Sequence, residues 1–332
     1  MFRLSSFIAP AFVLGSYLMA SPLSAQCVGE NLLATMTPAD RAELQTATNA
    51  VPYPQGNFWR ASRGDQVITL IGTYHLDDPR HAATMTKMEP LIQAAKTVLV
   101  EAGPHEEKAL IAHMARDPSI MLITEGPTLL EMLPPADWDA LTKALSARGV
   151  PSLLAAKFQP WYVNLMLAIP ACTITSPQTG RGLDGMVMAA AAKAGVPLRA
   201  LEPYDTLFSL FDTMTTEEQL GMIKATLMMD SQSADFTVTL TEAYFAEDSR
   251  LIWEFMRAQS YALPGYTKDR VDREFARMEE SLMSARNRNW IPVLTTAESP
   301  VFAAFGALHL AGNEGVLALL EDNGFTLERL PF

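Results

Sequence analysis

Two histidines of the chain share the same local pattern, a Gly-x-x-His motif. The copies are Gly72-Thr73-Tyr74-His75 and Gly306-Ala307-Leu308-His309, and the whole chain has five histidines. Each copy follows an apolar run, and a glycine at the end of a buried strand lets the backbone turn sharply. Imidazoles bind divalent metals and exchange protons near neutral pH. The motifs therefore predict that His75 and His309 share one site, although a single copy could also be a helix cap.

Two carboxylates also follow apolar runs that read as strands. Glu101 follows residues 97–100, and Glu202 ends the run 197–202. Open α/β sheets place their functional sites at the carboxyl ends of the strands. Two imidazoles with one or two carboxylates suit Zn, Mn, Co or Fe(II). The alternatives are that Glu101 is the buried partner of a basic residue and that Glu202, which precedes Pro203, only positions a turn.

Short apolar runs that alternate with helical segments predict an α/β fold. A mostly helical segment is expected at about 204–290. The other histidines, His81, His105 and His113, lie outside any matching context and are interpreted as surface or hydrogen-bonded structural residues. The predicted strands are residues 66–71, 97–103, 197–202, 301–305 and 326–330, and the predicted helices include 77–95, with a kink or break at Pro90, 186–194 and 313–323.

Several common functions find no support in the sequence. The chain has no Gly-x-Ser-x-Gly elbow, no Gly-x-Gly-x-x-Gly loop and no His-Glu-x-x-His motif. Its formal net charge of -12, from 25 basic and 37 acidic residues, repels phosphate backbones and anionic lipids, so nucleic acid is not an expected partner. With 332 residues, 49% of them hydrophobic, the chain is long and apolar enough to bury a sizeable core.

The N-terminus has the layout of an export signal. Arg3 precedes an apolar run from Phe7 to Ala20, and small residues lead to Ala25. We expect residues 1–25 to be removed and residues 26–332 to form a single domain in the periplasm or outside the cell, with no membrane insertion after cleavage. An uncleaved membrane anchor is the alternative. Two cysteines, Cys27 and Cys172, then most simply form one disulfide, and two free thiols are the other interpretation.

Several stretches together resemble the TraB/GumN family, also called TraB/PrgY/gumN, whose animal relatives are the Tiki proteins. The resemblance runs from about Cys27 to the C-terminus, and the paired cysteines resemble its exported bacterial branch. The stretches are the two Gly-x-x-His motifs, Val100-Glu101, Phe158-Gln159-Pro160-Trp161, Gly182-Leu183-Asp184, Leu201-Glu202, Arg286-Asn287 and the closing run from Phe305 to Gly312.

The resemblance implies a mixed sheet built from two related halves and flanked by helices, the fold of erythromycin esterase, ChaN and Tiki. It also implies a metal-dependent protease that uses Mn or Co. On this chain, His75 and His309 match the two metal ligands, and Glu101 matches the essential glutamate, as third ligand or general base. Arg286 and Asn287 match a pair typical of the branch.

We therefore expect an exported metal-dependent hydrolase that acts on peptides or amides, with Mn or Co as cofactor and Zn or Fe as alternatives. Arg286 or Asn287 would stabilise the oxyanion that develops on the substrate. Asp184 and Glu202 would hold a ligand histidine by its other nitrogen. The rival interpretations are a periplasmic peptide-binding module without catalysis and a metal-free esterase in which one motif histidine is the general base.

Overall fold

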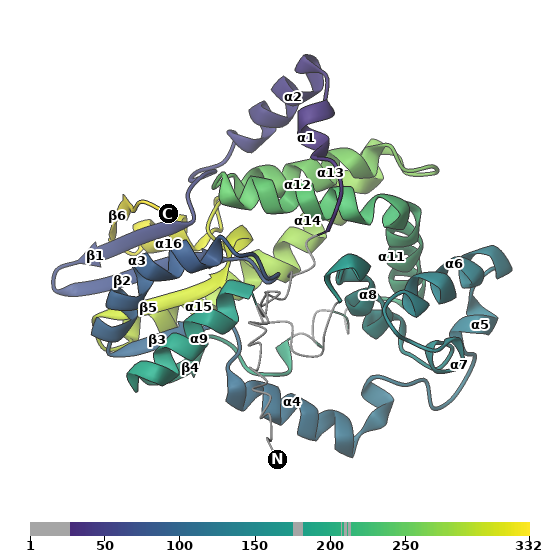
Figure 1. Cartoon of the computed structure of the whole chain (residues 1–332), viewed down its shortest axis with the longest axis horizontal. Helices are drawn as coiled ribbons and strands as arrows, with labels where there is room; N and C mark the ends of the chain where they lie inside the picture. The colour runs from purple at the N-terminus through teal and green to yellow at the C-terminus, as the bar shows by residue number, and fades with distance from the viewer. Residues whose placement is uncertain (1–26, 175–181, 207, 209–210, 212–213) are drawn as a thin grey trace, which may run out of the picture.

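One mixed sheet organises the part of the chain that the computed structural model describes, residues 27–174, 182–206, 208, 211 and 214–332 (Figure 1). The predicted signal peptide, residues 1–25, lies outside the described residues. The sheet has six strands in the order β4-β3-β5-β2-β1-β6. The strands are β1 (Phe58–Arg63), β2 (Gln66–Thr73), β3 (Thr97–Val100), β4 (Leu198–Ala200), β5 (Val301–Gly306) and β6 (Thr326–Arg329).

The sheet combines parallel and antiparallel pairs, which confirms the expected mixed α/β fold. Strands β4, β3, β5 and β2 run parallel to one another, so their carboxyl ends meet at one edge. Strands β1 and β6 add two antiparallel pairings. In the β2–β5 register Thr73 pairs with Gly306, which places the two Gly-x-x-His motifs side by side with an offset of one residue.

Strand β1 was missed by the sequence analysis. It is short and carries Arg60 and Arg63, so its buried residues Phe58, Trp59 and Ala61 do not form an apolar run. Its partner is nevertheless close in sequence, because Arg63 pairs with Gln66 across a tight turn. The antiparallel hairpin depends on this pairing rather than on local hydrophobic pattern.

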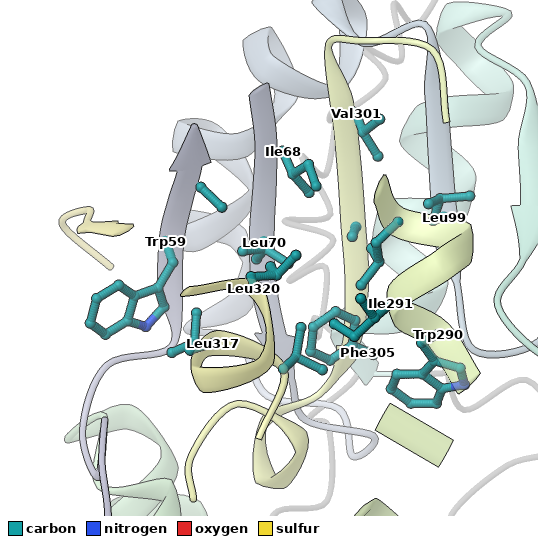
Figure 2. Close-up of a cluster of buried hydrophobic side chains, with 14 of the residues drawn as sticks. Trp59, Ile68, Leu70, Leu99, Trp290, Ile291, Val301, Phe305, Leu317 and Leu320 are labelled. Carbon is teal, nitrogen blue, oxygen red and sulfur yellow. The ribbon is translucent and has the colours of Figure 1, made fainter. Parts of the chain in front are cut away.

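Each face of the sheet is covered by its own pair of helices. On one face, strand residues such as Leu70 and Phe305 pack against Trp290 of α15 (Ala285–Thr296) and Leu317 of α16 (Val316–Asp322), as Figure 2 shows. On the other face, Phe302 and its neighbours pack against α3 (His81–Ala94) and α9 (Gly182–Ala194). Alternate β5 residues therefore face opposite layers, as the two-residue period of a strand requires.

Helical insertions follow β3 and β4. The helices after β3 include a group with its own apolar core, to which α11 also contributes (Figure 1). The first insertion contains α4 (Pro104–Arg116), η1 (Pro118–Ile120), α5 (Leu129–Met132), α6 (Pro135–Ser146), α7 (Ser152–Ala155), α8 (Pro160–Ala168) and η2 (Ala171–Thr173) before α9. The second contains α11 (Thr216–Met229), η3 (Asp230–Gln232), α12 (Ser233–Phe245), α13 (Ser249–Tyr261), α14 (Lys268–Glu279) and the π-helical turn η4 (Glu280–Ser284) before α15.

Three helices differ from their predicted bounds, and one of them, α16, begins at Val316 instead of residue 313. Helix α3 begins at His81, not at residue 77, and continues through Pro90, so the predicted alternative of a break at Pro90 is wrong. Helix α9 already begins at Gly182, whereas the sequence suggested residue 186. Its glycines lower local helix propensity, but Leu183 and Val187 are completely buried in the core, and this packing outweighs the propensity.

The predicted disulfide between Cys27 and Cys172 is confirmed, with a Cα–Cα distance of 5.2 Å. The segment after Cys27 leads to α1 (Leu32–Thr35) and α2 (Pro38–Thr48) and also contacts α12, because Glu30 N–H donates to Asp235 at 2.7 Å. A disulfide of this kind indicates folding in an oxidising compartment, outside the cytoplasm. Among the described residues, none of the helices has the length and apolarity that crossing a membrane requires.

Removing the disulfide should destabilise the fold strongly. The two cysteines are 145 residues apart in the chain, and a cross-link that closes so long a loop contributes about 5 kcal/mol by restricting the unfolded state. We expect the Cys27→Ser/Cys172→Ser variant to lose about that much free energy of unfolding in urea titrations. Reductant should shift the wild type towards the variant and leave the variant itself unchanged. An unchanged urea midpoint in the variant would contradict the prediction.

Candidate active site

Four polar side chains meet at the carboxyl edge of the parallel strands. His75 follows β2, Glu101 follows β3, and Glu202 lies just beyond β4. His309 lies in the short 3-10 helix η5 (Ala307–His309), directly after β5. The sequence predicted this gathering, because parallel strands end at the same edge.

His309 is buried and held in one orientation by Asn287. Its Nδ1 lies 2.6 Å from Asn287 Oδ1, while Asn287 Nδ2 donates to the Glu314 carbonyl at 2.8 Å. Because the amide nitrogen is used there, Oδ1 is the acceptor, and Nδ1 of His309 carries the proton. Burial lowers the pKa of His309 to about 3, so the ring is neutral and its Nε2 carries a lone pair, which lies 3.2 Å from Arg286 Nη1. Trp290 packs against the ring with centroids 4.4 Å apart.

His75 is oriented in the same way by a carboxylate, although its side chain is 68% exposed. Its Nδ1 lies 2.8 Å from Asp184 Oδ2, and the other Asp184 oxygen accepts a hydrogen bond from Thr73 Oγ1 at 2.5 Å. The hydrogen bond to Asp184 raises the pKa of His75 to about 9. Both motif histidines therefore have Nδ1 anchored to an oxygen, an arrangement common among metal-binding histidines, although Nε2 of His309 is engaged by Arg286.

Glu101 connects the two motifs. Its Oε1 accepts the Gly306 N–H at 2.6 Å, and its Oε2 accepts Arg286 Nη2 at 2.6 Å. Oε1 lies 4.0 Å from His309 Nε2. Burial acts to raise the pKa of Glu101, but the neighbouring His309, Arg286 and His75 outweigh burial and lower it to about 2. Glu101 is therefore a carboxylate at neutral pH.

Arg286 lies between the two glutamates. Its Nε and Nη2 bind Glu202 at 2.9 and 2.7 Å, and Nη2 also binds Glu101. Its Nη1 donates to the Leu282 carbonyl at 2.9 Å and lies 3.2 Å from His309 Nε2. The five N–H groups of an arginine are all engaged by these contacts. The guanidinium therefore neutralises the carboxylates and could reach a substrate oxygen only by releasing His309.

A π-helical turn, η4, immediately precedes Arg286 and Asn287 on α15. Such turns are frequent at functional sites.

Asn287 is 1% exposed, and the contacts of its amide hold His309 in place rather than reaching solvent. Glu202 contacts Arg286 and the Trp290 indole N–H, at 3.0 Å, and has no described hydrogen bond to either motif histidine. Asp184, in contrast, lies where a residue that orients a ligand histidine would be expected.

Gly306 leaves room among the three candidate ligands. Gly306 has a φ of -51°, which any residue can adopt. The glycine is therefore not needed for the sharp backbone turn that the sequence suggested here. A Cβ at this position would lie 3.3 Å from Glu101 Oε1, 3.5 Å from His75 Nε2 and 3.7 Å from His309 Cδ2. The two imidazole rings and the Glu101 carboxylate thus lie around one small space, and nitrogen and oxygen donors of these types suit a divalent cation. Within the described residues, no group of three or more His, Cys, Asp or Glu side chains is arranged so that it could hold a metal ion.

Sequence reasoning missed two residues that support the site, Thr73 and Trp290. Thr73 belongs to the first motif, and Trp290 lies one helical turn after Arg286, so the spacing could have identified both. The stretch from Phe158 to Trp161, which also carries the family resemblance, lies at the start of α8. Gln159 and Trp161 donate to backbone carbonyls of residues 119–122 and thereby join α8 to the segment around η1.

The buried neutral state of His309 should make the metal-free fold sensitive to acid. The unfolded chain binds a proton near the ordinary pKa of 6.5 and the folded chain only near 3, so stability falls as pH decreases through this range. Between pH 6.5 and 4.5 we expect a slope of up to about 1.4 kcal/mol per pH unit from this residue. The raised pKa of His75 makes stability change with pH only between about 6.5 and 9, which lies above this range.

Urea titrations of chelator-treated protein test this expectation. His309→Gln removes the titration and should flatten the slope, whereas His105→Gln, at an exposed position, should retain it. Equal slopes in wild type and His309→Gln would contradict the assignment of a neutral His309.

Comparison with protein families gives one match. The profile of the TraB/PrgY/gumN family matches residues 57–329, a span that includes all six strands of the described sheet and both Gly-x-x-His motifs. A comparison with curated proteins gives no match.

Proposed function

This chain belongs to the TraB/PrgY/gumN family, and from this premise we propose that it is an exported metal-dependent hydrolase of peptide or amide bonds. The observation that carries the proposal is the convergence of His75, Glu101 and His309 around Gly306. The site offers two imidazoles that can be neutral, each with its Nδ1 held by a hydrogen bond, and one ionised carboxylate. Such a set of donors suits a catalytic divalent ion.

His75 Nε2, His309 Nε2 and Glu101 would hold the ion, with Mn or Co expected and Zn or Fe as alternatives. A bound ion of this type polarises a carbonyl and lowers the pKa of water towards neutrality. Neutral His309 would offer its Nε2 without first losing a proton, because burial already keeps the ring uncharged, once Arg286 Nη1 moves away from that nitrogen. His75 must release the proton that its pKa of about 9 retains at neutral pH.

The protein's own groups supply orientation, charge and a base. Asp184 and Asn287 keep the two imidazoles in the required tautomer. If Glu101 is the general base and not the third ligand, its Oε1 would accept a proton from the attacking water and pass it to the leaving amine. Arg286 keeps Glu101 ionised and, after release of His309 Nε2, would donate Nη1–H to the developing oxyanion.

A metal-free hydrolase is a second candidate, supported by the Asp184–His75 pair. A histidine whose Nδ1 is held by a carboxylate and whose Nε2 faces the site is the arrangement of a general base. Arg286, which already lies between Glu101 and His309, would then be the resident positive charge. A peptide-binding module without turnover is the outcome if neither candidate hydrolyses a substrate.

The disulfide and the N-terminal sequence support a proposal for the compartment in which the protein acts. The Cys27–Cys172 bond requires an oxidising compartment, and the predicted signal in residues 1–25 directs the chain there. We therefore propose a periplasmic or secreted enzyme. The alternative is a protein still anchored by its N-terminal apolar run.

The test uses the full chain, expressed with its N-terminal segment and purified after export. Elemental analysis and calorimetric titration with Mn, Co and Zn measure metal binding, and mass spectrometry follows cleavage of a peptide library and of simple esters. The proposal expects about one metal per chain, with turnover that chelator abolishes and metal restores. Chelator-resistant turnover would support the metal-free hydrolase. Peptide binding without products would support the binding module.

A further inference from the structure

The loop that carries His75 is held by the first residues of α9, and Gly182 makes the closest approach. Gly182 has φ of +57°, a conformation that favours glycine. A Cβ on this residue would lie 2.3 Å from the Tyr74 carbonyl oxygen, 2.5 Å from His75 C and 2.6 Å from the His75 carbonyl oxygen. These atoms belong to the backbone, so no side-chain rotation could relieve the overlap.

Three consecutive residues of α9 hold His75 from different directions. Leu183 N–H donates to the Tyr74 carbonyl at 3.0 Å, and Gly182 N–H donates to Asp77 Oδ1 at 3.1 Å. Asp184 then binds the His75 ring itself at Nδ1. The helix start therefore fixes both the peptide of His75 and the direction of its imidazole.

His75 depends on this support more than His309 does. The His309 side chain is 6% exposed and packs against Trp290, whereas the His75 side chain is 68% exposed. Packing cannot position an imidazole that faces solvent to this extent, so its backbone and its Nδ1 hydrogen bond must do so. Both depend on how closely α9 approaches the loop.

We infer that Gly182 is a positioning residue for His75, because only a glycine lets α9 come close enough to hold the His75 peptide and place Asp184 on its ring. This inference rests on the proposed function for the role of His75, but it applies whether His75 is a metal ligand or a general base. Larger residues at position 182 would displace the His75 loop from Asp184.

The test compares Gly182→Ala with Gly195→Ala. Gly195 follows the other end of α9 and has φ of +69°, but a Cβ there would meet no atom within 4 Å. The control therefore carries the same kind of backbone strain without the close approach. We expect Gly182→Ala to lower kcat/KM by about 100-fold, mainly through kcat, since a shift of about 1 Å in a catalytic group has an effect of that size. Gly195→Ala should remain within about twofold of wild type, as expected for a remote position.

A double-mutant cycle separates positioning from general destabilisation. If Gly182 acts through the His75–Asp184 contact, Asp184→Asn should have little further effect once Gly182→Ala is present, within about threefold. Fully additive losses would overturn the inference. Equal activities of Gly182→Ala and Gly195→Ala would overturn it as well.

A readout without turnover keeps the inference separate from the proposed function. The His75 ring proton resonance, assigned through a His75→Gln variant, should move in Gly182→Ala and stay in place in Gly195→Ala. A wild type without turnover would contradict the proposed function, and the ring resonance would still decide the positioning role. If Gly182→Ala does not fold, Asp77→Ala removes the partner of Gly182 N–H without adding an atom and should move the same resonance. An unmoved resonance there would overturn the inference.

Discussion

Replacing either motif histidine by alanine is expected to abolish metal binding and to lower kcat/KM by about 10³-fold or more. Each substitution removes one of the two motif imidazole rings, both of which lie beside Gly306. A carboxylate and a single imidazole bind divalent ions much more weakly than the complete set. Elemental analysis and turnover of the two single variants check the expectation.

The two variants should differ in stability, which separates chemistry from folding. His75→Ala removes an exposed ion pair with Asp184 that stabilises the fold fully below pH 6.5 and is lost as pH rises through about 9, so in chelator-treated protein the free energy of unfolding should fall by at most about 1 kcal/mol below pH 6.5 and by less above pH 9. His309→Ala leaves a cavity beside Trp290 and an unpaired Asn287 oxygen, and should cost about 3 kcal/mol. His105→Ala, at an exposed histidine on α4, should keep both activity and stability. Full metal content in His75→Ala or His309→Ala would show that the site is wrongly assigned.

Arg286→Met is expected to destabilise the metal-free protein by about 3 kcal/mol or more. The guanidinium is 15% exposed and is shared by Glu101 and Glu202, which are 20% and 13% exposed. Its removal would leave two partly buried carboxylates without the cation that is hydrogen-bonded to both of them. The loss is measured as the free energy of unfolding in urea at neutral pH.

Arg288 provides the matched control for Arg286. It lies two residues further along α15, and its ion pairs with Glu280 and Glu314 are exposed, so Arg288→Met should cost less than about 1 kcal/mol. Added Mn or Co should restore part of the stability of Arg286→Met, because a cation bound at Glu101 replaces the lost charge. A variant as stable as Arg288→Met would contradict the central role of Arg286 in the charge balance.

The comparison of sequence and structure is clearest for the strand ends. Local patterns were enough to predict that β2, β3, β4 and β5 end near His75, Glu101, Glu202 and His309, because apolar runs identify buried strands and parallel strands share a carboxyl edge. The cysteine count was likewise enough for the disulfide, since two cysteines in an exported chain have one simple pairing.

The partners of these groups could not be predicted from local sequence. Arg286 binds Glu101 across 185 residues of chain, and Asp184 binds His75 across 109. Such contacts depend on how α9 and α15 pack against opposite faces of the sheet, which no local periodicity encodes. The same applies to β1, whose alternation is interrupted by arginines and which is defined by its pairing with β2. Residue types thus determine which groups can do chemistry, whereas tertiary packing alone determines which atoms of those groups face the site.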